Sequence, residues 1–132
     1  MRTALFSFSA CLCGITTAAY AQPPRIFSRG VVNAASYAPA GVPGGGIAQG
    51  SIFTIFGANL GPTPGVQAAS FPIQTALSNC SIRFVSGSNA VNVLPLYVSA
   101  GQINALMPSN APTGLGALQV TANNFRIQSP VL

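Results

Sequence analysis

The sequence contains no aspartate, glutamate, histidine or lysine, so arginine is its only charged side chain. Five arginines give the 132-residue chain a formal charge of +5, and charged residues make up only 4% of it. General acid–base catalysis near neutral pH relies mainly on the four missing residue types, and most metal sites need carboxylate, imidazole or several thiolate ligands. We therefore expect no catalytic residue, no metal site and no cofactor, and we predict that the protein is not an enzyme.

The low charge density also bears on possible partners. The arginines are scattered along the chain, at Arg2, Arg25, Arg29, Arg83 and Arg126. A phosphate backbone needs several cations along one face, so we expect no binding to nucleic acid. Apolar residues make up 49% of the chain, enough to build the core of one domain. Its surface must then be hydrated by uncharged polar side chains and exposed backbone, a composition typical of exported β-rich modules.

The N-terminal segment has the pattern of a secretory signal peptide. Arg2 supplies a positive charge, residues 4–17 are mostly apolar or small, and Ala19–Tyr20–Ala21 offers a cleavage site before Gln22. We predict a signal peptide over residues 1–21, export to the periplasm, the cell surface or the medium, and no stable membrane span after cleavage. Two alternatives are a retained anchor, for which the apolar stretch is short, and a lipoprotein modified at a cysteine of the same segment.

Cleavage after Ala21 leaves Cys80 as the only cysteine, so no internal disulfide can form. Cys80 alternates with Ile82 and Phe84, as expected of a strand with one buried face. A reactive or intermolecular thiol is the alternative, but the chain has no histidine or lysine to lower a thiol pKa. We expect Cys80 to act as a small apolar core residue.

Short runs rich in Val, Ile, Phe and Tyr, bounded by Gly, Pro, Asn and Ser clusters, predict an antiparallel all-β fold. The runs are Val31–Val32, Ser51–Phe56, Cys80–Val85, Val91–Val98, Gln102–Met107, Ala117–Thr121 and Phe125–Leu132. Residues 22–29 are expected to be an extended lead-in, and residues 30–132 to be two packed antiparallel sheets. Pro95 cannot donate a ladder hydrogen bond, so its strand should lie at an edge or contain a bulge. Ser88–Asn89 beside Gly87 predicts a hairpin turn between the strands that end at Val85 and begin at Val91.

Three stretches together resemble a known family: Val31–Tyr37, Gly50–Gly61 and Leu96–Ala105 followed by Pro108. They are similar to an uncharacterised family of secreted bacterial domains that itself resembles the IPT/TIG immunoglobulin-like modules. The resemblance implies an immunoglobulin-like β-sandwich over residues 30–132, and it supplies no catalytic residue. The family usually continues past the point where Ser129–Leu132 ends this chain, so we expect a truncated last strand.

Uncharged polar side chains gather around one predicted strand pair. Gln102 and Asn104 lie on one face of their strand, Tyr97 lies on the preceding run, and Asn33 and Tyr37 come earlier. Amides supply a paired donor and acceptor that match sugar hydroxyls, and a tyrosine ring can stack on an apolar sugar face. Tyr97, Gln102 and Asn104 are therefore the candidate ligand-binding residues. The alternative is structural, with the amides holding loop backbone groups in place.

Two functions follow from these patterns. The first is a non-catalytic exported immunoglobulin-like module with a structural or protein-interaction role outside the cytoplasm. The second is a module that binds a polysaccharide or another neutral ligand. The first function implies other extracellular or cell-surface proteins as partners, and the second implies a polysaccharide.

Overall fold

The computed structural model describes residues 22–129, so the predicted signal peptide (1–21) and residues 130–132 lie outside the described part. All regular elements within this range are β-strands, which confirms the all-β prediction. They are β1 (Arg25–Asn33), β2 (Ile52–Ala58), β3 (Val66–Gln67), β4 (Ala76–Leu77), β5 (Cys80–Ser86), β6 (Asn89–Val98), β7 (Gln102–Leu106), β8 (Ala117–Ala122) and β9 (Phe125–Gln128).

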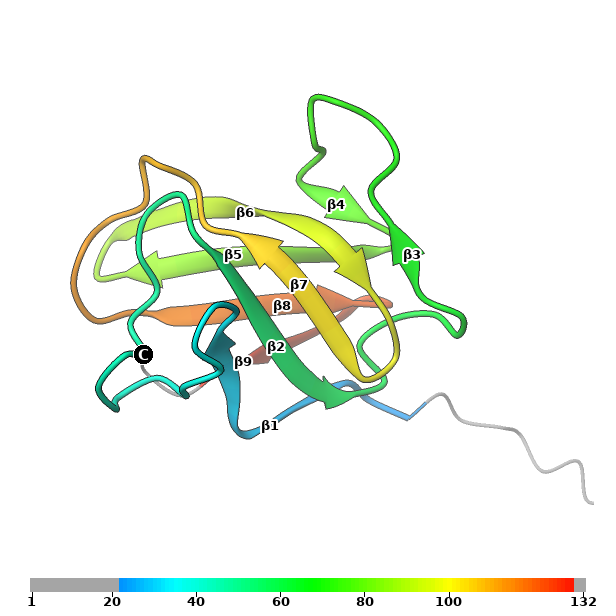
Figure 1. Cartoon of the computed structure of the whole chain (residues 1–132). Helices are drawn as coiled ribbons and strands as arrows, with labels where there is room; N and C mark the ends of the chain where they lie inside the picture. Colours follow the sequence, from blue (N-terminus) through cyan, green and yellow to red (C-terminus); the bar gives the residue numbers. More distant parts are fainter. Residues whose placement is uncertain (1–21, 130–132) are drawn as a thin grey trace, which may run out of the picture.

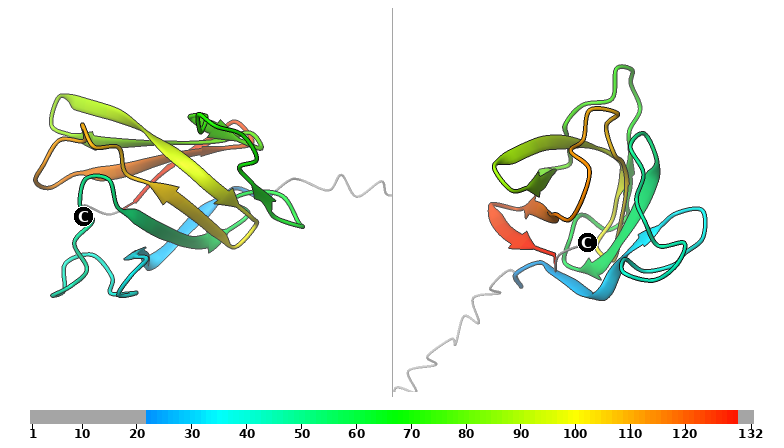
Figure 2. Two further views of the ribbon diagram at one scale, coloured as in Figure 1. Left: turned by 45° about the horizontal axis from the view of Figure 1, so that its top comes forward. Right: turned by 90° about the vertical axis from the view of Figure 1, so that its left-hand side faces the viewer.

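The strands form one continuous antiparallel sheet in the order β1-β2-β7-β6-β5-β8-β9, with β3 paired to β6 and β4 paired to β5. The sheet curls until its two end strands approach each other, so that it is nearly barrel-shaped (Figure 1). The end-on view of Figure 2 shows β1 and β9 on either side of the remaining seam. No ladder joins these two strands within residues 22–129.

Strand β6 turns the corner between the two halves of the sheet. Its first part pairs with β5 from Asn89 to Val93, and its second part pairs with β7 from Leu94 to Val98. The register shifts between Pro95 and Tyr97, which is the bulge that Pro95 predicts. Because bulges bend strands, this irregularity lets one strand serve both halves.

Tight turns join the consecutive strands of the β4–β6 and β8–β9 hairpins. Gly87 has a φ of 60° as the first central residue of the predicted β5–β6 turn, where Ser86 pairs with Asn89. Asn123 and Asn124 both have positive φ between β8 and β9, as a type I′ turn requires. The asparagine pair therefore sets the register of the final hairpin.

The core fills the interior of the curled sheet. Its largest fully buried side chains are Phe53, Ile55, Leu60, Ile82, Val93, Val98, Ile103, Leu118 and Val120. Apart from Leu60, which follows β2, they lie on the inner strands β2, β5, β6, β7 and β8, because each strand directs alternate side chains inward. The core is aliphatic apart from its phenylalanines, Cys80 and Met107. No polar side-chain atom buried within residues 22–129 is left without a hydrogen bond.

Some strand boundaries differ from the sequence pattern. Residues 22–29 were expected to be an extended lead-in, but β1 begins at Arg25, pairs with Ala58, and brings Ile26 against the core. The pairing is interrupted by an irregularity before Val31, which hides the alternation from the sequence. Strands β3 and β4 span only Val66–Gln67 and Ala76–Leu77, too short to have a period.

Candidate functional site

The structure brings the three candidate residues together on the sheet. Tyr97 lies on β6 and is the register partner of Asn104 on β7. Gln102 lies two residues before Asn104 on the same strand, so both side chains point to the same face. All three are half-buried. We call the outward face of β2, β7 and the second part of β6 the amide face.

The amide face is set by the alternation of β7. Ile103 and Ala105 are fully buried on the inner side, so Gln102 and Asn104 must point outward. Antiparallel pairing then places Tyr97 directly across from Asn104, close enough for their side chains to interact. The positions of these side chains therefore follow from packing of the core on the opposite face.

Hydrogen bonds within the cluster fix the orientation of the Asn104 amide. Its Oδ1 accepts a hydrogen bond of 2.9 Å from Gln102 Nε2 and one of 3.0 Å from Thr54 Oγ1. The other polar atoms of the cluster, Asn104 Nδ2, Gln102 Oε1 and the Tyr97 hydroxyl, bond to none of the described residues. The cluster thus presents a donor, an acceptor and a hydroxyl, all uncharged.

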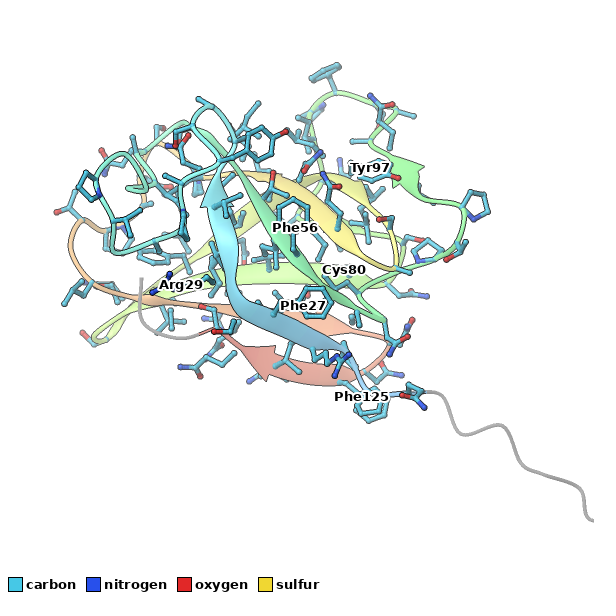
Figure 3. All side chains as sticks on the ribbon, turned by 60° about the horizontal axis from the view of Figure 1, so that its bottom comes forward. Phe27, Arg29, Phe56, Cys80, Tyr97 and Phe125 are labelled. Atoms are coloured by element: carbon cyan, nitrogen blue, oxygen red, sulfur yellow. The ribbon has the colours of Figure 1, made fainter. Side chains whose placement is uncertain are left out.

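Two further residues belong to the amide face, and the sequence reasoning missed both. Thr54 is only 3% exposed, and it lies between its two register partners, Asn104 on β7 and Val32 on β1. Phe56 is the β2 partner of Gln102 and is partly exposed. Figure 3 labels Phe56 on β2 and Tyr97 beside β3. Period-two alternation puts Thr54 and Phe56 on one face, but only the β2–β7 register adds them to the site.

The Tyr97 ring is held in place by the loop before β3. A Cβ atom built on Gly65 would lie 2.2 Å from the Tyr97 hydroxyl oxygen and 2.5 Å from Cζ. The ring therefore packs directly on the Gly65 backbone, where no larger residue fits without moving it. This contact holds the hydroxyl end of Tyr97 over the loop before β3, on the side of β6 opposite β7.

Asn33 and Tyr37, which the sequence analysis grouped with the cluster, lie elsewhere, at the end of β1. Asn33 Oδ1 accepts a hydrogen bond of 2.8 Å from the backbone of Ala35, and its Nδ2 donates one of 2.8 Å to Gly46. This amide holds loop backbone groups, which is the structural role that the sequence offered as the alternative. Tyr37 is 66% exposed and has a φ of 54°.

Cys80 occupies the core position predicted from its alternation with Ile82 and Phe84. Its side chain is fully buried, and it is a free thiol within residues 22–129. Burial raises the pKa of the Cys80 thiol from 9.0 to about 11, because an apolar environment disfavours the thiolate. A thiol in that state is a poor nucleophile, so Cys80 acts as an apolar core residue.

The electrostatics of the described residues come from exposed arginines. Arg25 and Arg29 lie on β1, the neighbour of β2, whereas Arg83 and Arg126 lie on β5 and β9 in the other half of the sheet. Arg25 stacks over the ring of Phe27 at 5.6 Å from its centroid. Residues 22–129 hold no group of metal-ligating side chains and no helix long and apolar enough to cross a membrane.

Comparison with known proteins gives no relative from which a function can be taken. No protein-family model, no curated protein and no solved structure matches the chain.

Proposed function

We propose that this protein is a non-catalytic binding module that recognises an uncharged, hydroxyl-rich ligand, with a polysaccharide as the simplest example. The amide face is the proposed binding surface. One observation carries the proposal: Asn104 Nδ2 and Gln102 Oε1 on β7, and the hydroxyl of the neighbouring Tyr97 on β6, have no hydrogen-bond partner among the described residues. Sugar hydroxyls donate and accept at once, so a mixed set of uncharged donors and acceptors suits them.

The aromatic residues of the amide face complete this chemistry. Phe56 pairs with Gln102 and Tyr97 pairs with Asn104, so each amide has a ring across the strand from it. Rings of this kind can stack on the apolar face of a sugar while the amides bond to its hydroxyls. A site mounted on paired strands also loses little conformational entropy on binding.

The compartment and the family follow as parts of the same proposal. The pattern of residues 1–21 supports export to the periplasm, the cell surface or the medium. The three stretches Val31–Tyr37, Gly50–Gly61 and Leu96–Ala105 support an immunoglobulin-like domain of the IPT/TIG type. In this interpretation, the two halves of the sheet that meet at β6 correspond to the two layers of a sandwich.

A structural or protein-interaction role is the second candidate, and one residue favours it. Phe71 is 90% exposed in the loop between β3 and β4, which protrudes from the sheet in Figure 1. An aromatic side chain at such a position is a suitable anchor for a partner protein. This role predicts binding that depends on Phe71 and is independent of Tyr97.

Retention of the full chain on insoluble polysaccharides and cell-wall fractions distinguishes polysaccharide binding from the protein-interaction role. The proposal predicts retention on at least one polymer, loss of retention for Tyr97→Ala, and normal retention for Phe71→Ala. A thermal melt of each variant shows that it is folded. If a cooperatively folded protein is retained on none of the polymers, or if Phe71→Ala is the variant that loses retention, polysaccharide binding through the amide face is wrong.

A further inference from the structure

A cleft separate from the amide face lies at the opposite end of the sheet from the β3–β4 loop. It is a cleft of about 440 Å³ between the glycine-rich loop at residues 38–50 and the loop at residues 107–116. Figure 1 shows both loops at the end where β5 turns into β6. Tyr97, Gln102 and Asn104 do not line this cleft, so it is separate from the amide face.

The loops that form the cleft are tied to each other at their bases. Gly50 N donates a 2.9 Å hydrogen bond to Met107 O, and Met107 N donates one of 2.9 Å to Ser51 O. The side chain of Gln49 donates to the backbone oxygen of Ala111, joining the loops a second time. These bonds preform the cleft, so a ligand would not have to order its walls.

The outer loop has its own attachments to β1. Asn33 Nδ2 holds Gly46 O, and Ser36 Oγ donates a 2.7 Å hydrogen bond to Gly44 O. Asn33 therefore stabilises the wall of the cleft, because Gly46 is one of the lining residues.

The lining of the cleft is uncharged and mainly apolar. Phe84 and Met107 contribute nearly buried side chains, and Ile47, Ala111 and Pro112 add further apolar surface. No arginine, cysteine or tyrosine lines it, so none of the ionisable residues of the described chain is present to balance a charge on a ligand. A charged group placed there would be desolvated without a partner, which is strongly unfavourable.

Backbone N–H groups add hydrogen-bond donors to the polar side chains of Gln49 and Thr113. Within residues 22–129, the N–H groups of Gly46 and Ile47 on one wall and of Gly114 on the other donate to no protein acceptor. Gly46 and Gly114 have no side chain to shield their backbone. These donors suit a ligand that carries a hydrogen-bond acceptor such as a carbonyl or ether oxygen.

We propose that this cleft binds a small uncharged molecule with a flat apolar body and a hydrogen-bond-accepting oxygen. The apolar body lies against Phe84 and Met107, and the oxygen accepts from a free backbone N–H of a glycine-rich wall. The cleft volume falls in the range of small-molecule sites, which is about 300–1,000 Å³.

Prodan, an uncharged naphthalene ketone whose fluorescence reports polarity, is the probe for a titration of the full chain. Two competitors share one apolar body: 2-acetylnaphthalene is neutral and 2-naphthoate is an anion. We expect 2-acetylnaphthalene to displace the probe and 2-naphthoate to be at least about tenfold weaker. This order would run against the net charge of +5, which favours the anion. An anion that competes equally well or better would overturn the proposal.

The place of binding is read from the methionine methyl groups. The chain has two methionines, Met1 and Met107, so ¹³C-methyl labelling gives two signals, which Met107→Leu assigns. We expect a saturable shift of the Met107 methyl on titration with 2-acetylnaphthalene, and none of the Met1 methyl. Probe binding without a Met107 shift would place the ligand elsewhere and overturn the proposal. The titration itself uses the parent protein, and Met107→Leu serves only to assign the signal.

A matched pair of glycine substitutions gives a further test. A Cβ atom on Gly46 meets no heavy atom within 4 Å, and one on Gly101, outside the cleft, meets none closer than 3.9 Å. Gly46→Leu puts a side chain at the cleft wall and should lower Prodan affinity by at least about tenfold. Gly101→Leu should leave it within about twofold. Equal affinities for two folded variants would contradict binding in the cleft.

Discussion

The chain uses the same side-chain amide in two ways, at Asn33 and at Asn104. Asn33 ends a strand, and both ends of its amide bond to backbone atoms of the following loop. Asn104 lies within β7, where its Oδ1 accepts from two side chains and its Nδ2 bonds to none of the described residues. Loop backbone needs partners that strand backbone already has from its ladder. An amide on a strand face is therefore available to a ligand, and an amide at a strand end is not.

The largest expected effect is on ligand affinity, and it distinguishes Tyr97 on the amide face from Tyr37 beside Asn33. Tyr97→Ala should lower affinity for the retained polysaccharide by about 2 kcal/mol, roughly thirtyfold, because the ring and its hydroxyl are both lost. Tyr37→Ala should leave affinity unchanged, since Tyr37 lies beside the Asn33 turn and is mostly exposed. Binding isotherms of the two variants, with melts to verify folding, measure the difference. Equal losses would remove the distinction between the two regions.

Replacing each asparagine by aspartate keeps the accepting Oδ1 atom and removes the donating Nδ2 group, so the two roles of the amide can be measured separately. Asn104→Asp keeps the acceptor for Thr54 and Gln102 but removes the free donor, so ligand affinity should fall about tenfold with little change in stability. Asn33→Asp keeps the turn at Ala35 but loses the bond to Gly46 O, so stability should fall by about 1 kcal/mol with affinity unchanged. Urea unfolding and isotherms on both variants check this. The reverse pattern would exchange the roles of the two amides.

A smaller effect is expected from Gly65, which supports Tyr97. In Gly65→Ala, the added methyl group would overlap the end of the Tyr97 ring, so the ring must move while the core stays in place. We expect a loss of affinity of about 1 kcal/mol, fivefold or so, with a similar or smaller loss of stability. The matched control is Gly101→Ala, whose methyl group meets no crowded neighbour. If both variants bind like the parent, the position of Tyr97 is not important for binding.

The last prediction concerns pH, to which no response is expected over most of the accessible range. The chain has no Asp, Glu, His or Lys, so both the free energy of unfolding and ligand affinity should be flat between about pH 4 and pH 8. Above pH 9 the unfolded state loses the Cys80 proton first, because burial raises the folded pKa to about 11. Stability should then fall by about 1.4 kcal/mol per pH unit up to pH 11, relative to Cys80→Ala. Urea unfolding at several pH values measures this, and a steep change near pH 5 would contradict it.

Most strands could be predicted from the sequence because alternation and turn residues are local signals. Cys80, Ile82 and Phe84 point inward as their spacing predicts, and Pro95 lies at a bulge. Strands β3 and β4 could not be predicted, since two residues have no period, and the interruption in β1 hides its start. Local signals thus fix where strands run but not how irregular they are.

The candidate site could be predicted only in part, for a related reason. The alternation of β7 places Gln102 and Asn104 on one face, and the short connection to β6 brings Tyr97 alongside. Thr54 and Phe56 join them through the β2–β7 pairing, which links segments far apart in the sequence. The same limit applies to the cleft, whose two loops meet through hydrogen bonds between Gly50, Ser51 and Met107. Long-range register is set by packing of the whole core.

The most direct test of the central claim is NMR of the side-chain amides while a soluble oligosaccharide of the retained polymer is added. We predict that the Asn104 Nδ2 and Gln102 Nε2 signals shift with a single saturable isotherm, and that the Asn33 Nδ2 signal stays in place. A shift of Asn33 with Asn104 unmoved would contradict the claim that the amide face is the binding surface.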